Sequence, residues 1–398
     1  MQKDAKAEES RDMSLIGNWN YPTSVRFGAG RIKELPDHCK AVGIKRPLLV
    51  TDPGLSPLPM IADAKAALVA AGLHVAVFDK VQPNPVAQNV EDGLKVYRAG
   101  GHDGVIAFGG GSALDAGKTI AFMAGQTRPM WDFEDIGDWW TRADENGIAP
   151  IIAVPTTSGT GSEVGRAGVI TDERTHTKKI IFHPKMMPRI ALLDPALTLG
   201  LPARLTAGAG MDALAHCLEA YCAPGFHPLA DGVAVEGLRL CKDYLPRAVK
   251  TGSDLEARAM MMAAAAMGAT AFQKGLGAIH SLSHPVGSLY GTHHGMTNAV
   301  FMPYVLDLNR PAIEERVARL SAYLGLDPSF MGLRHWILRL RDEIGVPHTL
   351  LAFGVPTHEA ERVAAMAVED PTAGSNPVKL TKEKARAVFE AAAAGTLA

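Results

Sequence analysis

Two segments in the second half of the chain carry acid and histidine side chains at a spacing that suits metal binding. Asp212 and His216 are four residues apart in GMDALAH, and His280 and His284 repeat that spacing in GAIHSLSHPVG. Side chains four residues apart lie on one face of a helix, and His294 follows in a glycine-containing loop. One carboxylate with several imidazoles and no cysteine suits Fe(II), Zn(II), Mn(II), Co(II) or Ni(II). The pattern therefore predicts a metal site that can keep a coordination position open for chemistry.

A glycine-rich turn in the first half of the chain is typical of phosphate binding. The segment GVIAFGGGSALDAGK runs from an apolar strand into three glycines, a serine and an amphipathic helix. Glycines let the backbone approach a ligand closely, and the free N–H groups at a helix start favour anionic oxygens. We expect Gly109, Gly110, Gly111 and Ser112 to contact a pyrophosphate. The spacing is not GxGxxG, and a tight turn without a ligand is the other interpretation.

Two more strand ends fit a dinucleotide. Asp52 closes the strand in LLVTDPGL, where a carboxylate could accept hydrogen bonds from ribose hydroxyls and repel a 2′-phosphate, which favours NAD over NADP. A turn-forming aspartate before Pro-Gly is an equally good interpretation. The segment VPTTSGTGSE at 154–163 supplies hydroxyls that could hold nicotinamide, ribose or phosphate oxygens.

The elements that must position these residues fall into two groups. From residue 47 to about 194, short apolar runs alternate with amphipathic stretches, which indicates βαβ units and a parallel sheet. After Pro202 helical patterns dominate. We therefore expect a disordered leader at 1–14, an NAD(P)-binding α/β domain at 15–197 and a helical metal and substrate domain at 198–398.

Composition narrows the class of partner. The chain has 398 residues, 47% of them hydrophobic, and a formal net charge of -2. No run of Lys and Arg marks a surface for nucleic acid or an anionic membrane. The most apolar window, 259–272, is too short for a membrane span and predicts a buried helix. The charged N-terminus is unlike a secretory signal, and the four cysteines have no CxxC spacing, so we expect a cytoplasmic protein that binds a small molecule.

The chain resembles the iron-containing, or group III, alcohol dehydrogenase family in an ordered set of motifs. These motifs run from about residue 20 to Pro377: PNP at Asn84, GGGSALDAGK, PTTSGTGSE, LDP at Asp194, GMDALAHCLEAY, and GAIHSLSHPVG followed by HHGMTNAV. The resemblance implies a Rossmann-like α/β domain with a parallel sheet and an all-α metal domain, an architecture shared with dehydroquinate synthase. It also implies a cleft between the domains for NAD and substrate, and a homodimer or larger assembly.

The resemblance assigns roles to individual residues. Asp212, His216, His280 and His294 match the four metal ligands, and His284 matches a histidine beside the nicotinamide that is not a ligand. Cofactor positions are matched by Asp52, Asn84, Gly109, Gly110, Gly111, Ser112, Asp115, Thr156, Thr157, Thr160 and Lys179, with Lys178 as the alternative to Lys179 in THTKK.

The substrate pocket is the least determined part of the site. Phe272 and Leu276 are candidate pocket walls, with core packing as the other interpretation, and Thr372 occupies a position that can face substrate in relatives. Two departures from the family pattern bear on the substrate. Gly165 replaces a common threonine after SEV, and the loop 131–140 is rich in acid and tryptophan.

The implied activity is reversible hydride transfer between NAD(H) and a small primary alcohol or its aldehyde, with a diol or hydroxy acid included. One divalent metal is required, Fe(II) before Zn(II), and His284 either relays a proton or shapes the pocket. Two alternatives stay open. One is an NAD- and metal-dependent lyase of the dehydroquinate synthase type, which would need several basic residues around its substrate, and the other is a non-catalytic NAD- and metal-binding protein.

Overall fold

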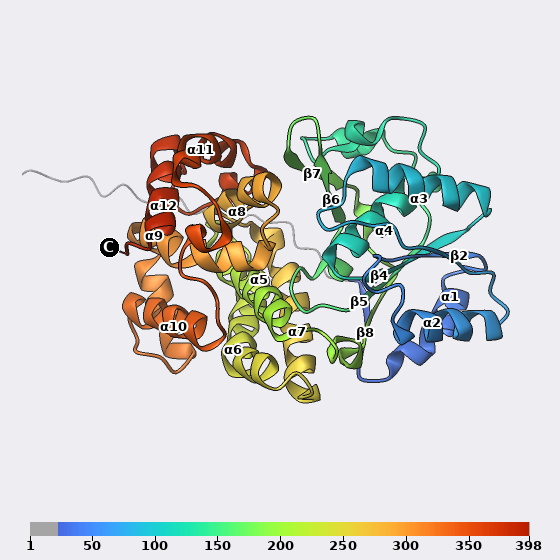
Figure 1. The fold of residues 1–398 in the computed structure, drawn as a ribbon, viewed down its shortest axis with the longest axis horizontal. Coiled ribbons are helices and arrows are strands. Elements are labelled where there is room, and N and C mark those ends of the chain that lie inside the picture. Colours follow the sequence, from blue (N-terminus) through green and yellow to red (C-terminus); the bar gives the residue numbers. More distant parts are fainter. Residues whose placement is uncertain (1–22, 398) are drawn as a thin grey trace, which may run out of the picture.

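The computed structural model describes residues 23–397 and shows two parts that lie side by side (Figure 1). One part holds a parallel sheet with helices on both faces, and the other is helical. The predicted fold class, an α/β domain followed by an all-α domain, is confirmed. The leader expected at 1–14 lies outside the described residues.

The main sheet has six strands in the order β1-β8-β5-β4-β2-β3, and all pairs in it are parallel. Parallel strands covered on both faces are expected to be apolar throughout, and β2, β4, β5 and β8 are buried along their whole length. The strands are β1 Ser24–Phe27, β2 Pro47–Val50, β3 Ala76–Phe78, β4 Gly104–Gly109, β5 Ile151–Pro155 and β8 Ile190–Leu193.

Alternate residues of the strands face two separate cores. Val105 of β4 packs with the helices α3 (Ala87–Ala99) and α4 (Gly111–Met123), whereas its neighbour Ile106 packs with α1 (Leu35–Ala41) and α2 (Pro59–Ala70). The chain passes from β2 to β3 on one side and then crosses to β4 on the other side. Ligands of open α/β sheets bind at the carboxyl ends of the strands where the order reverses in this way.

A two-stranded antiparallel sheet, formed by β6 (Ala167–Asp172) and β7 (Thr177–Phe182), was not anticipated from the sequence. Its strands mix glycine, threonine and lysine with isoleucine, so their apolar pattern is weak. The hairpin contacts α4 through β6 and α8 (Ala278–Tyr290) through β7. It therefore lies against both parts of the molecule and helps to form the wall between them (Figure 1).

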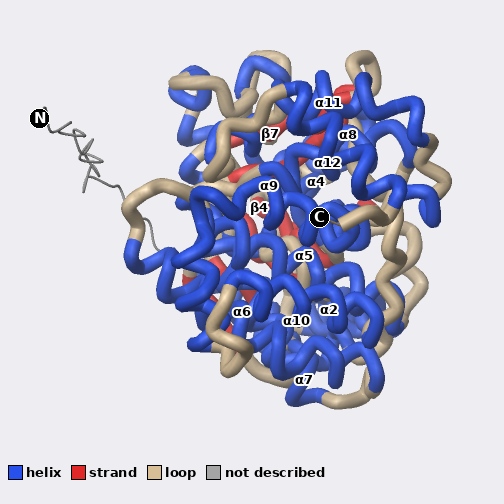
Figure 2. Tube along the Cα trace, turned by 90° about the vertical axis from the view of Figure 1, so that its left-hand side faces the viewer, coloured by secondary structure: helices blue, strands red, loops and turns tan. Residues whose placement is uncertain are grey.

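The helical part surrounds α5 (Ala203–Cys222), which packs against α6, α7 and α9. A helix that is buried almost all round can hold polar side chains away from water. Figure 2 looks onto this part, with strands of the sheet visible between the helices. The other helices are α6 Pro228–Lys250, α7 Leu255–Ala271, α9 His294–Tyr323, α10 Phe330–Glu343, α11 Ala360–Glu369 and α12 Lys382–Ala394.

Short 3-10 turns join these elements, and three of them border the site: Ser162–Val164, Phe272–Lys274 and Pro371–Ser375. In residues 23–397 no helix combines the length and the apolar character that crossing a membrane requires. The apolar window at 259–272 falls mostly within α7, as expected.

Candidate active site

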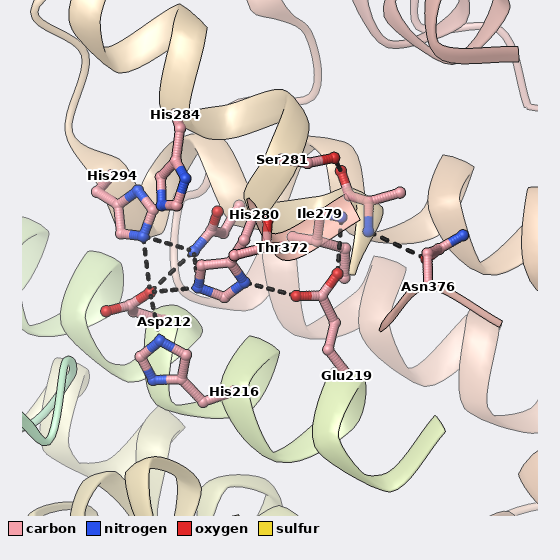
Figure 3. Close-up of polar contacts among 12 residues, drawn as sticks. Asp212, His216, Glu219, Ile279, His280, Ser281, His284, His294, Thr372 and Asn376 are labelled. Atoms are coloured by element: carbon pink, nitrogen blue, oxygen red, sulfur yellow. Dashed lines mark hydrogen bonds and ion pairs between the residues drawn. The ribbon is translucent and has the colours of Figure 1, made fainter. Parts of the chain in front are cut away.

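Three helices bring the four predicted metal ligands together. Asp212 and His216 lie on α5, His280 on α8, and His294 is the first residue of α9 (Figure 3). The Nε2 atoms of His216 and His280 are each 3.7 Å from Asp212 Oδ1, and that of His294 is 3.5 Å away. The ligand atoms of Asp212, His280 and His294 all lie within 4.8 Å of one another.

These spacings suit a single ion. Two ligand atoms that each sit about 2.1 Å from an ion at a tetrahedral angle are about 3.4 Å apart. Asp212, His280 and His294 therefore need little movement to coordinate one metal, whereas His216 lies outside that group of three although its Nε2 is 3.7 Å from Asp212 Oδ1. The donor set, one oxygen and three nitrogens, fits a divalent transition metal.

The electrostatics of the cluster favour the ligand forms of Asp212, His216 and His294. Burial would raise the pKa of Asp212, but His216 and His294 outweigh it and hold that pKa well below its ordinary value. Burial lowers the pKa of His216 to about 4 and that of His294 well below its usual range. At neutral pH Asp212 is thus charged while both imidazoles are neutral, as metal ligands must be.

Glu219 orients His280 and was missed in the sequence analysis. Its Oε2 accepts a hydrogen bond from His280 Nδ1 at 2.5 Å, and its Oε1 accepts one from the Ile279 N–H at 2.7 Å (Figure 3). Burial opposes the charge on His280, but Glu219 and Asp212 raise its pKa to about 9. A carboxylate on the far nitrogen fixes the ring and points Nε2 at the metal position. The available signal was position, because Glu219 follows Asp212 by seven residues on the same helix face.

Asn298 also belongs to the cluster and was missed. Its amide nitrogen donates to Asp212 Oδ1 at 2.8 Å and lies 3.3 Å from Nε2 of both His280 and His294. Asn298 stands one helical turn after His294 on α9 and is fully buried. It therefore holds the carboxylate of Asp212 in place from the side of α9.

His284 lies beside the cluster but is oriented by a different carboxylate. Its Nδ1 is 2.8 Å from Asp370 Oδ2, and its ring stacks on that of His294 with centroids 5.3 Å apart. Asp370 Oδ1 accepts hydrogen bonds from the backbone N–H and the hydroxyl of Thr372. This leaves Nε2 of His284 as the nitrogen that can exchange a proton. Asp370 was not singled out from the sequence, since it lies 86 residues from His284.

The dinucleotide residues gather at the carboxyl ends of β2 and β4, on either side of the point where the strand order reverses. Asp52 Oδ1 accepts hydrogen bonds from the N–H groups of Gly54 and Leu55, so this residue does form the turn that follows β2. A side chain at Gly109 would come within 3.5 Å of its other oxygen, Oδ2. Asp52 therefore forms the turn after β2 and also lies beside the glycine turn.

The glycine turn packs against the threonine-rich loop after β5. Gly109 has φ 151°, a conformation open to glycine, and Gly110 caps α4 without a side-chain hydrogen bond. A Cβ at Gly111 would lie 2.5 Å from Thr160 Cγ2, and one at Gly110 would lie 3.4 Å from Thr157 Cγ2. The glycine turn therefore lies directly against this loop. The first amides of a helix have no acceptor within the helix, so those at the start of α4 suit an anionic group.

The other predicted cofactor residues differ in their placement. Thr156 is buried directly after β5, and Asn84 has a left-handed backbone, φ 52°, in the turn before α3. Asp115 accepts hydrogen bonds from Ser162 Oγ and from the N–H of Val169, so its carboxylate ties α4 to the loop and hairpin beside it. These contacts give Asp115 a positioning role.

The preference for Lys179 over Lys178 is not supported by the structure. Lys179 Nζ pairs with Glu134 at 3.2 Å and with Asp172 at 3.6 Å, and it lies over the ring of Trp131. Successive residues of a strand point to opposite faces, so Lys178 faces the site instead. Burial lowers the pKa of Lys178, against the attraction of Asp212, Asp115 and Asp370.

Glu163, in the 3-10 turn Ser162–Val164, is a buried carboxyl whose ionisation opposes folding. Burial raises its pKa to about 7, from an ordinary value of 4.5, although Lys118 acts in the other direction. The stability that protonated Glu163 contributes is therefore present below pH 4.5 and lost as the pH rises through 7.

Replacing Glu163 with glutamine should remove this loss. The free energy of unfolding of Glu163→Gln, relative to the unmodified protein, is expected to rise by roughly 1 to 3 kcal/mol between pH 5 and pH 8. Urea unfolding of both proteins at several pH values measures the difference. Parallel stability curves over that range would contradict this assignment.

A cavity of about 300 Å³ opens next to the metal cluster, and the three predicted pocket residues all line it. Phe272 also places its ring against that of His216, with centroids 5.1 Å apart. Thr372 joins the cavity to Asp370 and hence to His284. Leu276 and Gly165 complete this part of the wall.

A nucleotide-type sheet edge, a buried carboxylate and histidine cluster, and a cavity whose lining residue Phe272 contacts that cluster are together the features expected of a nicotinamide-linked, metal-dependent dehydrogenase. Comparison with known proteins agrees. The model of the iron-containing alcohol dehydrogenase family matches residues 22–195, and that of the C-terminal region of Fe-containing alcohol dehydrogenases matches residues 206–393.

Individual relatives match along almost their whole length. The chain is 40% identical over 380 residues to 4-hydroxybutyrate dehydrogenase of Cupriavidus necator, covering 93% of this chain and 98% of that protein. A crystal structure of 1,3-propanediol oxidoreductase superposes with a TM-score of 0.90 at 36% identity, covering 95% and 100% of the two chains. Sulfoacetaldehyde reductase from Bifidobacterium kashiwanohense, solved in complex with NAD+, has a TM-score of 0.86 at 28% identity, covering 95% and 99%.

The chain belongs to the iron-containing alcohol dehydrogenase family. It is an NAD-linked, metal-dependent oxidoreductase that interconverts alcohols and aldehydes, as the resemblance implied.

Proposed function

We propose that Asp212, His216, His280 and His294 hold one divalent ion, Fe(II) in preference to Zn(II), and that the adjoining cavity receives a small primary alcohol. The observation that supports this most directly is the approach of three Nε2 atoms to one oxygen of Asp212. When bound there, the ion supplies Lewis acidity to the oxygen of the substrate. Glu219 and Asn298 keep the ligands aligned, and the ring of Phe272 covers His216 on the side of the cavity.

The cofactor in this proposal is NAD rather than NADP. The amides of Gly109, Gly110, Gly111 and Ser112 bind its pyrophosphate, and Asp52 accepts hydrogen bonds from the adenosine ribose. Thr156, Thr157, Thr160 and Asn84 line the path between the two ends of the cofactor. Lys178 takes the role first given to Lys179, because its ammonium group is the one that faces the site.

His284 acts as the proton relay in this scheme. As hydride passes from the alcohol carbon to the nicotinamide, the hydroxyl proton must leave, and Nε2 of His284 is free to take it. Asp370 holds the imidazole through Nδ1 and so fixes the orientation of its Nε2. If His284 only shapes the pocket, its hydrogen bond to Asp370 should have no effect on the rate of the reaction.

The Asp370→Asn substitution separates these roles. It removes the charge but keeps a hydrogen-bonding partner for Nδ1, so we expect kcat to fall about 10- to 100-fold while metal content stays unchanged. The solvent deuterium isotope effect on kcat should increase, because proton transfer becomes limiting. An unchanged kcat with an unchanged isotope effect would assign His284 to shaping the pocket.

We also propose that the protein is a cytoplasmic homodimer or larger homo-oligomer, with the domain boundary at residues 197 and 198. The relatives named above act on a hydroxy acid, a diol and a sulfonated aldehyde, so the substrate lies among small ω-substituted alcohols and aldehydes. The lyase alternative is not favoured, because Arg166 is the only Arg or Lys among the residues that line the cavity.

A substrate panel tests the proposal. Protein loaded with Fe(II) or Zn(II) should form NADH from C2 to C6 alcohols, diols or hydroxy acids with NAD, and turn over far more slowly with NADP. Absence of NADH formation with every alcohol, from protein that contains the metal and binds NAD, would contradict it.

A further inference from the structure

The cavity beside the metal cluster contains a single cationic side chain, Arg166, which directly precedes β6. The other residues that line the cavity are apolar or uncharged, apart from one carboxylate, Asp135. The hydroxyl of Thr270 and the amide nitrogen of Gln273 donate to backbone carbonyls of the same segment. A small, mainly apolar cavity whose charged groups are one guanidinium and one carboxylate can orient a ligand that carries one negative charge toward the guanidinium and away from the carboxylate.

Arg166 is half-buried and held against an aromatic ring. Its guanidinium lies over Phe182 of β7, 5.4 Å from the ring centroid. In the part of the chain that the structure describes, no ion pair joins this guanidinium to a carboxylate. Burial raises the pKa of Asp135, and the positive charge of Arg166 opposes that rise without a direct contact. Stacking leaves the hydrogen-bonding edge of a guanidinium available, and that edge matches a carboxylate in a bidentate fashion.

Gly165, the residue before Arg166, keeps space open in this wall. A Cβ at Gly165 would meet nothing closer than 3.5 Å, so the position tolerates a side chain but carries none. Its φ of -104° is open to any residue. That Cβ would lie nearest to Ser162 and to Lys118 Nζ, and Gly165 itself lines the cavity beside Arg166.

The residues that line the cavity connect it to the proposed ligands and to His284. Phe272, which lines it, places its ring against that of His216, and Thr372, which also lines it, is bonded to Asp370. Arg166, Phe182 and Asp135, from the hairpin and the loop before it, line the same cavity. A ligand in the cavity would therefore meet the guanidinium as well as the residues that contact His216 and Asp370.

We propose that this cavity selects short ω-hydroxy acids and the corresponding aldehyde acids, with Arg166 binding the carboxylate. This inference rests on the proposed function, since it names the substrate class of the same site. In the oxidation, the C–H bond of the terminal carbinol breaks with transfer of hydride to NAD+, the hydroxyl proton passes to His284, and a C=O bond forms. The carboxylate takes no part in the chemistry and serves to position the chain.

Three four-carbon substrates test the proposal: 4-hydroxybutanoate, 1,4-butanediol and 1-butanol. With the intact protein, kcat/KM for the hydroxy acid should exceed that for 1-butanol by at least about 10-fold. In Arg166→Leu it should fall by about 100-fold for the acid, mostly through KM, and by less than about 3-fold for the two neutral alcohols. In Arg166→Lys, kcat/KM for the acid should lie between the values for the intact protein and for Arg166→Leu, because lysine keeps the charge and loses the bidentate geometry.

Asp135→Asn is the matched control at the same end of the cavity. Removing the opposing carboxylate should lower KM for the acid and leave KM for 1-butanol unchanged. A measurement on the unmodified protein does not depend on any variant folding. KM for 4-hydroxybutanoate should rise with ionic strength, whereas KM for 1-butanol should not.

The outcomes separate this inference from the proposed function. If the loaded protein oxidises none of the three substrates, the proposed function fails. Three results would show that the substrate class is wrong while the dehydrogenase activity stands. They are an equal kcat/KM for 1-butanol and the acid, a KM for the acid that does not depend on salt, and an equal loss of kcat/KM for all three substrates in Arg166→Leu.

Discussion

His280→Ala is expected to lose tight metal binding and alcohol oxidation together. The substitution removes the Nε2 atom 3.7 Å from Asp212 Oδ1 and leaves Glu219 Oε2 without the imidazole that it holds, while Oε1 keeps the Ile279 N–H. Losing a ligand should weaken metal affinity by at least about 100-fold, since even outer partners of metal ligands contribute 10- to 100-fold. Metal content of the purified variant and NADH formation with an alcohol measure the two effects.

An exposed histidine far from the cluster supplies the control for this prediction. His74 lies in the turn before β3 and contacts none of the ligands, so His74→Ala should keep both metal and activity. If His280→Ala retains one ion per chain and normal turnover, the cluster is not the catalytic metal site.

Gly111→Ala is expected to reduce NAD affinity by about 100-fold or more. The new Cβ would lie 2.5 Å from Thr160 Cγ2 and 3.0 Å from its Oγ1, closer than side chains approach one another. Relief requires the glycine turn and the threonine-rich loop to move apart, which misplaces the amides that bind the pyrophosphate. Quenching of intrinsic fluorescence by NAD, or calorimetric titration, measures the affinity.

Two further variants show whether the close approach is the cause. Gly232→Ala, in α6 where a Cβ meets nothing within 4 Å, should leave NAD affinity unchanged. Adding Thr160→Ser to Gly111→Ala removes the methyl group in conflict and should restore part of the lost affinity. An unaltered affinity in Gly111→Ala would mean that this turn does not bind the cofactor.

The grouping of the carboxylate with the histidines could be predicted from the sequence because part of its geometry is local. Asp212 with His216, and His280 with His284, share helix faces by their spacing alone. Spacing could not separate His284 from the ligands, and the resemblance to a family was needed for that. The structure shows the physical difference, since His284 is held by Asp370 and the other imidazoles converge on Asp212.

Contacts between distant segments could not be predicted in this way. Asp370 reaches His284 across 86 residues, and Asp115 reaches Val169 across 54. Neither distance leaves a periodic signal in the sequence. The parallel sheet was predictable, because strands buried on both faces read as continuous apolar runs.

The choice between Lys178 and Lys179 could not be made from the sequence for a related reason. Lys178 and Lys179 are adjacent in a strand, so one faces the site and the other faces Glu134 and Asp172. Which of them faces the site depends on the register of the β6–β7 hairpin, and that hairpin was itself not anticipated. A shift of one residue in register exchanges the two side chains.

Metal titration of the stripped, unmodified protein tests the central claim most directly. Protein freed of metal by a chelator, supplied with NAD and a primary alcohol under anaerobic conditions, should form no NADH. Stepwise addition of Fe(II) should restore turnover in proportion to the ion added and level off at one ion per chain. Full turnover in protein shown to contain no metal would contradict the account.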